Sequence, residues 1–355
     1  QRSDAAASER ERQMLESLAA LPKDKKQAYE EAAQKAPRIV EIESPFERFL
    51  HAHHHDPIAA AEGLALYWSK RRKIFGEEAF CRPLTVMSTK EGVQSAMTDE
   101  LIATVFQQGM VAVSSVPAPD SSPVITLDRE FAPDVWSTTG EQNVRSKLAF
   151  YTLQVVSESS LAISPGFAAI IAIQNGTFKA PIDDGPRKLL ESGILPVKVR
   201  AVHILARKNN SIVEAMVNGG LQIARWWSYI YFRIRVHFLG SNGDAYQELK
   251  EYGFCEENIP ERLGGTSNGK AWYKERLAVE KERYAFLTAP DVNSPAARDH
   301  SNESQISNKD KSRPGSEDFG ETSKSEKHDS DSIRDWVIEH LENYEITKLQ
   351  KEISL

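Results

Sequence analysis

Five stretches in the middle of the chain carry apolar residues in β-branched runs or at every second position. They are residues 110–116, 123–127, 166–173, 199–205 and 232–239. The last stretch places Phe232, Ile234, Val236 and Phe238 at a spacing of two, which is the repeat of a strand with one buried face. We therefore predict a β-strand in each segment.

Between these strands, apolar residues recur at the spacing of an α-helix. The clearest case is 141–163, where Val144, Leu148, Tyr151 and Val155 share one face. Further helices are predicted at 184–192, 211–227 and 244–252. Strands that alternate with helices indicate an α/β fold whose mixed, largely parallel sheet is flanked by helices.

The first 76 residues are predicted to be helical. Residues 1–36 form two weakly amphipathic helices with a break at Pro22, and Pro37 is expected to end the second. A short helix follows at 45–53. The next helix begins with Asp56 as its N-cap and ends at Gly76. A helical N-terminal cap therefore precedes the α/β region.

The C-terminal part of the chain differs in composition. Between residues 291 and 331 the large apolar residues are Val292, Ile306 and Phe319, which cannot offset the entropy of ordering, so we expect disorder. Residues 332–355 regain helical spacing. The predicted organisation is an N-terminal extension (1–44), a helical region (45–98), an α/β domain (99–288), an acidic linker (289–331) and an amphipathic helix (332–355).

The composition of the chain argues against several classes of protein. A net charge of −7 argues against a general nucleic-acid binder. Cys81 and Cys255 are too few for a disulfide framework, which favours a reducing compartment such as the cytoplasm. No apolar run approaches the roughly 20 residues of a membrane span, and Gln1 begins no apolar signal segment. A protein associated with membranes only at their surface fits these features.

Motifs of catalysis are missing from the sequence. It has no G-x-S-x-G elbow, phosphate-binding P-loop or dinucleotide-binding glycine pattern, so we expect neither an enzyme nor a cofactor. Asp128 and Glu130 follow a strand and are expected to be solvated. His51, His53, His54, His55 and Asp56 are metal-ligand types, but they straddle a helix end, and we predict no metal site there.

Residues 198–240 are basic and aromatic. Seven cations, among them Lys198, Arg200, Arg233 and Arg235, accompany one acid, which gives +6 in a chain whose remainder carries −13. Aromatic residues including Trp226 and Trp227 are interleaved with them. Cations with interfacial aromatics predict a surface that docks on an anionic membrane. The alternative is that the aromatics belong to the core and the cations merely flank them.

The helix predicted at 211–227 carries Gly219 and Gly220 in its middle, which costs about 1 kcal/mol per glycine relative to alanine. Such a weakened helix is predicted to act as a movable gate with this glycine pair as its hinge. Close packing of the helix against the sheet is the alternative explanation.

Four motifs follow one another along the chain. They are Phe46-Glu47-Arg48-Phe49-Leu50 with the helix leading to Trp68-Ser69-Lys70-Arg71, then 195–204, 236–240 and Ile259-Pro260-Glu261-Arg262-Leu263-Gly264-Gly265-Thr266. These motifs resemble those of the CRAL-TRIO family of lipid-transfer proteins. The resemblance spans residues 45–266 and depends on the order and spacing of these motifs. It implies a helical cap, a sheet that forms the floor of a hydrophobic pocket, and a helix that closes the pocket.

The resemblance also implies residue roles. The gate falls at about 209–229. The lipid pocket is predicted to be lined by Ile125, Leu127, Ile171, Ile173, His203, Leu205, Ile212 and Met216. The tocopherol and retinaldehyde carriers of the family read Lys-Val-Arg where this chain has Lys198-Val199-Arg200. Such cations bind a phosphoinositide headgroup in the tocopherol carrier, and Arg235 matches a further one, whereas Tyr231 and His53 depart from the pattern.

The sequence therefore predicts a protein that holds one apolar lipid in an enclosed pocket and transfers or presents it at anionic membranes. The partners expected are a hydrophobic lipid and an anionic surface, with phosphoinositides as a candidate headgroup. One alternative is a lipid-sensing scaffold that recruits a protein partner through residues 332–355. The other is an enzyme whose motif a single sequence does not reveal.

Overall fold

The computed structural model describes residues 2–114, 116–118, 122–128, 144–173, 194–207, 233–239 and 245–288. The chain divides into two units, Gln1–Ala289 and Pro290–Leu355, and every described residue belongs to the first. Several predictions fall outside the described residues. They are the helices at 184–192 and 211–227, the disordered linker at 289–331 and the helix at 332–355.

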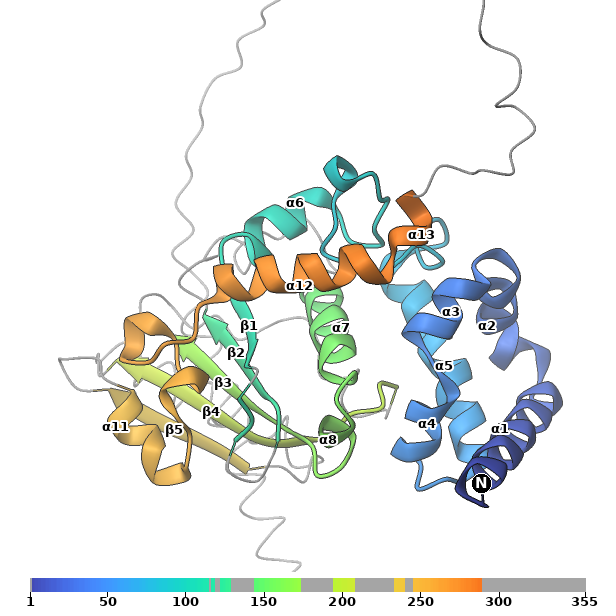
Figure 1. Cartoon of the computed structure of the whole chain (residues 1–355), viewed down its shortest axis with the longest axis horizontal. Helices are drawn as coiled ribbons and strands as arrows, with labels where there is room; N and C mark the ends of the chain where they lie inside the picture. The colour runs from blue at the N-terminus through green and yellow to red at the C-terminus, as the bar shows by residue number, and fades with distance from the viewer. Residues whose placement is uncertain are drawn as a thin grey trace, which may run out of the picture. The chain divides into compact units, whose positions relative to one another are not determined.

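One mixed sheet contains the five described strands in chain order (Figure 1). They are β1 (Val111–Ser114), β2 (Val124–Asp128), β3 (Phe167–Ile173), β4 (Val199–Arg207) and β5 (Arg233–Leu239). β1 pairs antiparallel with β2, whereas the pairs β2–β3, β3–β4 and β4–β5 are parallel. The α/β class with a largely parallel sheet is confirmed, and the strands lie where the apolar runs predicted them.

Five helices pack together before the sheet begins. They are α1 (Arg2–Ala20), α2 (Lys23–Lys35), α3 (Pro37–Glu43), α4 (Phe46–Ala52) and α5 (Pro57–Phe75). Asp56 caps α5 through Oδ1, which accepts hydrogen bonds from the backbone nitrogens of Ile58 and Ala59 at 2.9 and 3.2 Å. Pro37 begins α3 instead of only ending α2, because proline is well tolerated in the first helical turn.

The remaining described elements are mostly short helices between and after the strands. They are η1 (Thr89–Glu91), α6 (Asp99–Leu101), η2 (Ile102–Phe106), α7 (Val144–Val156), α8 (Ser160–Ile163), α11 (Tyr246–Leu249), η4 (Lys250–Tyr252), η5 (Glu256–Asn258), η6 (Glu261–Leu263), α12 (Gly269–Arg283) and α13 (Ala285–Thr288). The single helix predicted at 141–163 is divided in the structure into α7 and α8, with a break at 157–159. Figure 1 shows α12 running past β1 and the end of α7.

Two different apolar layers cover the two faces of the sheet. On one face, Ile125, Ala169 and Val202 join a core that includes Leu148 and Phe150 of α7. On the other face, the core contains aliphatic side chains of the strands together with residues of 245–263. They are Val124, Ala168, Ile170, Ala172, Leu205, Leu249, Phe254, Ile259 and Leu263. We call these the α7 face and the C-terminal face.

A buried carboxylate connects the helical region to the rest of the unit. Glu43 of α3 is 3% exposed. Its Oε1 accepts hydrogen bonds from Leu84 N at 2.8 Å and Tyr284 Oη at 2.7 Å, and its Oε2 accepts one from Arg71 of α5. One side chain thus ties two N-terminal helices to the 82–88 loop and to the residue that follows α12.

A second buried carboxylate ties α12 to the same loop. Glu280 Oε1 accepts from Tyr151 Oη at 2.8 Å and Arg276 Nε at 2.6 Å, and Oε2 accepts from Val86 N at 2.7 Å and from Thr85 Oγ1. Because four donors surround it, this fully buried group is satisfied without solvent.

Glu158 extends this network at the end of α7. It accepts paired hydrogen bonds from the guanidinium groups of Arg276 and Arg283. Burial opposes the charge of Glu158, but the bonds from Arg283 and Arg276 outweigh it and lower the pKa of the carboxyl to about 2. The Glu158 carboxylate therefore stays ionised wherever α12 is in place.

The network predicts a large stability loss for Glu280→Gln. The amide removes the charge that Arg276 faces and turns one acceptor into a donor, and breaking a buried ion pair costs about 3–5 kcal/mol. Urea unfolding followed by circular dichroism measures this loss. Glu275→Gln on the exposed side of α12 is the control and should stay within about 0.5 kcal/mol of the parent. Equal effects of the two substitutions would contradict the role of the network.

Candidate functional site

The α7 face of the sheet contains two rows of apolar side chains that run across the strands. Leu127 of β2 is paired with Ile171 of β3, and Ile171 with Ile204 of β4. In the neighbouring row, Ile125 is paired with Ala169, and Ala169 with Val202. Three predicted pocket residues, Ile125, Leu127 and Ile171, therefore lie together on one face.

Accessibility differs within this apolar surface. Ile125, Val202 and Ile204 are 3%, 4% and 4% exposed, whereas the paired side chains of Leu127 and Ile171 are only half-buried. Both lie in inner strands of the sheet, where a solidly packed layer would cover them completely. We call this pair of side chains the open patch.

On the opposite face, the described apolar side chains of β3 and β4 have no comparable opening. Ile170, Ala172 and Leu205 are all 0% exposed and pack on the 245–263 segment. The difference follows from the cover, because the C-terminal face is sealed by large side chains such as Phe254 and Leu263. Partial access is therefore a property of the α7 face at the open patch.

Two of the residues predicted to line the lipid pocket lie on the C-terminal face of the sheet, opposite the open patch. His203 pairs with Ile170 and Leu205 with Ala172, so both project to the C-terminal face. Side chains alternate along a strand, and a surface made by Ile171 and Ile204 cannot include His203 or Leu205. The prediction that all of these residues line one surface is wrong for these two.

The other predicted pocket and gate residues cannot be placed. Ile173 ends β3, but its side chain lies outside the described residues. Ile212 and Met216 also fall outside them, as do the hinge glycines Gly219 and Gly220 and the gate expected at 209–229. Their roles stay predictions.

The predicted headgroup cations occupy different surroundings. Lys198 and Arg200 are exposed at the beginning of β4. Arg235 is paired with His203 in the sheet, and its guanidinium lies 4.2 Å from the ring centre of Tyr252. Arg235 thus belongs to the C-terminal face. Arg233 begins β5 with its side chain outside the described residues, and Trp226 and Trp227 also lie outside them.

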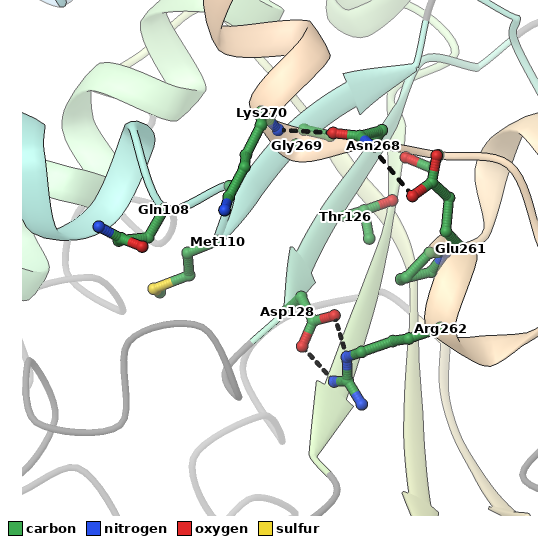
Figure 2. A pocket seen from close by; sticks show the side chains of 13 residues that line it. Gln108, Met110, Thr126, Asp128, Glu261, Arg262, Asn268, Gly269 and Lys270 are labelled. Carbon is green, nitrogen blue, oxygen red and sulfur yellow. Dashed lines mark hydrogen bonds and ion pairs between the residues drawn. The ribbon is translucent and has the colours of Figure 1, made fainter.

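A pocket of about 260 Å³ lies on the C-terminal side of β1 and β2 (Figure 2). Its wall includes the ion pair between Asp128 and Arg262, in which both carboxylate oxygens accept hydrogen bonds. Glu261 accepts a hydrogen bond from Asn268 Nδ2 at 3.0 Å, and Lys270 points its amine into the opening. The paired charges and amides in its wall would lose contact with water under a hydrocarbon chain, so this mixed pocket suits a ligand with polar groups better than a lipid chain.

Asp128 corrects a further prediction. It was expected to be solvated at a strand end, but it is 3% exposed and paired with Arg262. Its partner is far away in the sequence, so no local pattern could reveal the pair. Glu130 lies outside the described residues.

Glycines of the 259–270 region are explained by close backbone contacts. A Cβ atom on Gly265 would lie 2.1 Å from the carbonyl oxygen of Ile259, and one on Gly269 would lie 2.1 Å from that of Gly109. Only glycine fits such approaches. Gly265, in the motif that carries the family resemblance, therefore has a structural role in the 259–266 turn, and Gly269, beyond the motif, lets α12 begin against Gly109.

The histidine cluster forms a tight turn between α4 and α5. His54 and His55 have φ angles of +54° and +64°, and the rings of His51 and His55 stack at 6.0 Å. His53 packs against Gly63, where a Cβ atom would lie 2.5 Å from its Nε2. Across the described ranges, no group of three or more metal-ligating side chains is assembled.

Neither protein-family models nor curated proteins gave a match to this chain. The family resemblance therefore depends on the motifs alone. Within the part of the chain that the structure describes, no helix combines the length and the apolar character needed to cross a bilayer.

The open patch predicts selective thiol labelling. In a background with Cys81→Ser and Cys255→Ser, Leu127→Cys should react with a small maleimide at least about tenfold faster than Ile170→Cys, because a buried thiol reacts only after local opening. Ile170 is the matched control, since it is adjacent to Ile171 but faces the opposite layer. Equal rates at the two sites would show that the α7 face is as solid as the C-terminal face.

Proposed function

We propose that the protein binds one apolar lipid against the α7 face of its sheet and transfers or presents it at anionic membranes. The observation that carries the proposal is the open patch, where Leu127 and Ile171 of two inner strands stay partly accessible although Ile125, Val202 and Ile204 beside them are buried. Two paired aliphatic side chains with no described polar group between them suit a hydrocarbon chain better than a polar ligand.

Apolar contact alone can hold a lipid in such a complex, without a covalent bond or a catalytic step. Each methylene group that leaves water for an apolar surface contributes about 0.8 kcal/mol, so a long chain is held by contact alone. Apolar side chains cannot transfer protons or attack a bond, and on the α7 face the cross-strand rows of β2, β3 and β4 are apolar at the positions listed above. We therefore propose a binding protein and not an enzyme.

Membrane docking is the second part of the proposal. Lys198 and Arg200 are exposed at the beginning of β4, and residues 198–240 carry a net charge of +6. Each cation near an anionic surface contributes about 1 kcal/mol. The headgroup proposed is any anionic lipid, phosphoinositides included, and the protein would act from the cytoplasm as a peripheral membrane protein.

Lipid binding is tested by filling the open patch. The parent protein should bind a polyene fatty acid with intrinsic fluorescence, and Leu127→Trp should weaken this binding by about tenfold or more, since an indole displaces roughly two methylene groups of the ligand. Fluorescence titration of protein stripped of endogenous lipid measures the affinity.

Ile58→Trp is the control, because Ile58 is 62% exposed on α5 and far from the sheet in the sequence. It should leave the affinity unchanged. If the stripped parent protein binds neither this fatty acid nor extracted membrane lipids, the proposal is wrong.

Membrane docking is tested separately with vesicles that contain phosphatidylserine. Lys198→Ala/Arg200→Ala should weaken co-sedimentation by about thirtyfold, which corresponds to two cations at about 1 kcal/mol each. The control is Lys73→Ala/Lys274→Ala, which removes two exposed lysines from α5 and α12. The same loss in both variants would indicate a dependence on total charge instead of a docking surface.

A further inference from the structure

Two buried histidines form a hydrogen-bonded pair between neighbouring strands. The Nδ1 atom of His203 in β4 lies 2.9 Å from the Nε2 atom of His237 in β5. The rings stack with 5.1 Å between their centres and 9° between their planes, and the side chains are 4% and 5% exposed. The proposed lipid site does not use them, because His203 faces the C-terminal side of the sheet.

Aromatic residues of the 250–254 segment cover this pair. The Tyr252 ring lies edge-on to both imidazoles, at 5.3 Å from His203 and 5.2 Å from His237. Phe254 approaches His203 at 4.8 Å. Tyr252 is itself 40% exposed, so the cover over the histidine pair includes a ring that contacts water.

The short contact limits the protonation state of the pair. A hydrogen bond between two imidazoles needs one N–H donor and one nitrogen lone pair. A neutral pair supplies both, but a doubly protonated pair has no acceptor and places two cations in direct contact. The charged neighbours are Arg235 of β5, which stacks on Tyr252, and Glu248 of α11, so one cation and one acid face the pair from the elements packed on it.

We propose that the His203–His237 pair is an acid-sensitive latch, which holds the 250–254 segment on β4 and β5 when neutral and releases it when protonated. The latch goes beyond lipid binding and does not depend on it. Release begins at Tyr252, because movement of that ring admits water to both imidazoles. The latch makes the attachment of the 250–254 segment to the C-terminal face of the sheet dependent on pH.

The direction of the effect follows from proton linkage. Burial, the neighbouring imidazole and Arg235 lower the pKa of His203 from 6.5 to about 4, and burial also lowers the pKa of His237. A histidine with a depressed pKa in the closed state stabilises that state fully above the pKa of the open state. This stability is lost as the pH falls from 6.5 towards 4.

Hydrogen exchange of residues 245–254 tests the latch in the full-length protein. After correction for the intrinsic pH dependence of exchange, protection should fall about thirtyfold between about pH 8 and about pH 5, as the shift of His203 alone requires. His203→Gln/His237→Gln should remove most of this fall. Peptides from α12 in the same protein provide an internal reference.

His53→Gln is the matched control, because burial also lowers the pKa of His53, which lies in the N-terminal helical region. It should leave the response of 245–254 intact. A parent protein whose protection does not change with pH, or a double variant that responds as the parent does, overturns the proposal.

A second measurement needs no substitution and covers the case in which the double variant does not fold. In parent protein labelled with ¹³C at histidine, two imidazoles should still be neutral below the ordinary histidine pKa of about 6.5, in the pH range where the protection of residues 245–254 already declines. The latch is excluded if every imidazole titrates near its ordinary pKa of about 6.5.

Discussion

A sheet covered on both sides must divide its side chains between two layers, and the account of this protein depends on that division. Along β3, Ile170 is sealed under the 245–263 segment, whereas Ile171 keeps part of its surface accessible on the α7 face. The backbone is shared, so the difference arises from what covers each face. A solid layer on one side supports a partly open layer on the other, as a pocket with a rigid floor requires.

Buried ionic contacts hold the cover in position. Glu43 and Glu280 connect α3, α5, α7 and α12 to the 82–88 loop through hydrogen bonds that water does not reach. Buried ion pairs contribute little net stability compared with apolar packing, but they tolerate few alternative arrangements. We infer that this network fixes how the N-terminal helices, α7 and α12 lie against the 82–88 loop, because each carboxylate requires several donors at once.

Local patterns in the sequence predicted much of the fold. The strands followed from their apolar runs, and the bounds of α5 followed from Asp56 and Gly76. The helix α12 was not predicted, because its buried side chains include Arg276 and Glu280, which resemble an exposed polar surface in a sequence. When the charged side chains of a buried helix are paired with distant residues, the sequence alone does not indicate that the helix is buried.

The candidate site was predicted less well than the fold, and the reason is register. The pairing of β3 with β4 shifts between Phe167 and Ala168, and no sequence pattern reveals such an irregularity. Ile125, Leu127 and Ile171 were correctly grouped with one another, but His203 and Leu205 face the other layer. The pairing of Asp128 with Arg262 and of His203 with His237 also joins distant segments, so only the fold reveals it.

The central claim is that a lipid chain lies on Leu127 and Ile171. Photo-crosslinking with a fatty acid that carries a diazirine in its chain tests this contact directly, with the labelled residues located by mass spectrometry. The account predicts adducts on Leu127, Ile171 and their neighbours on the α7 face, and competition by unlabelled lipid. Adducts confined to residues 245–288, or spread without saturation over the surface, would contradict it.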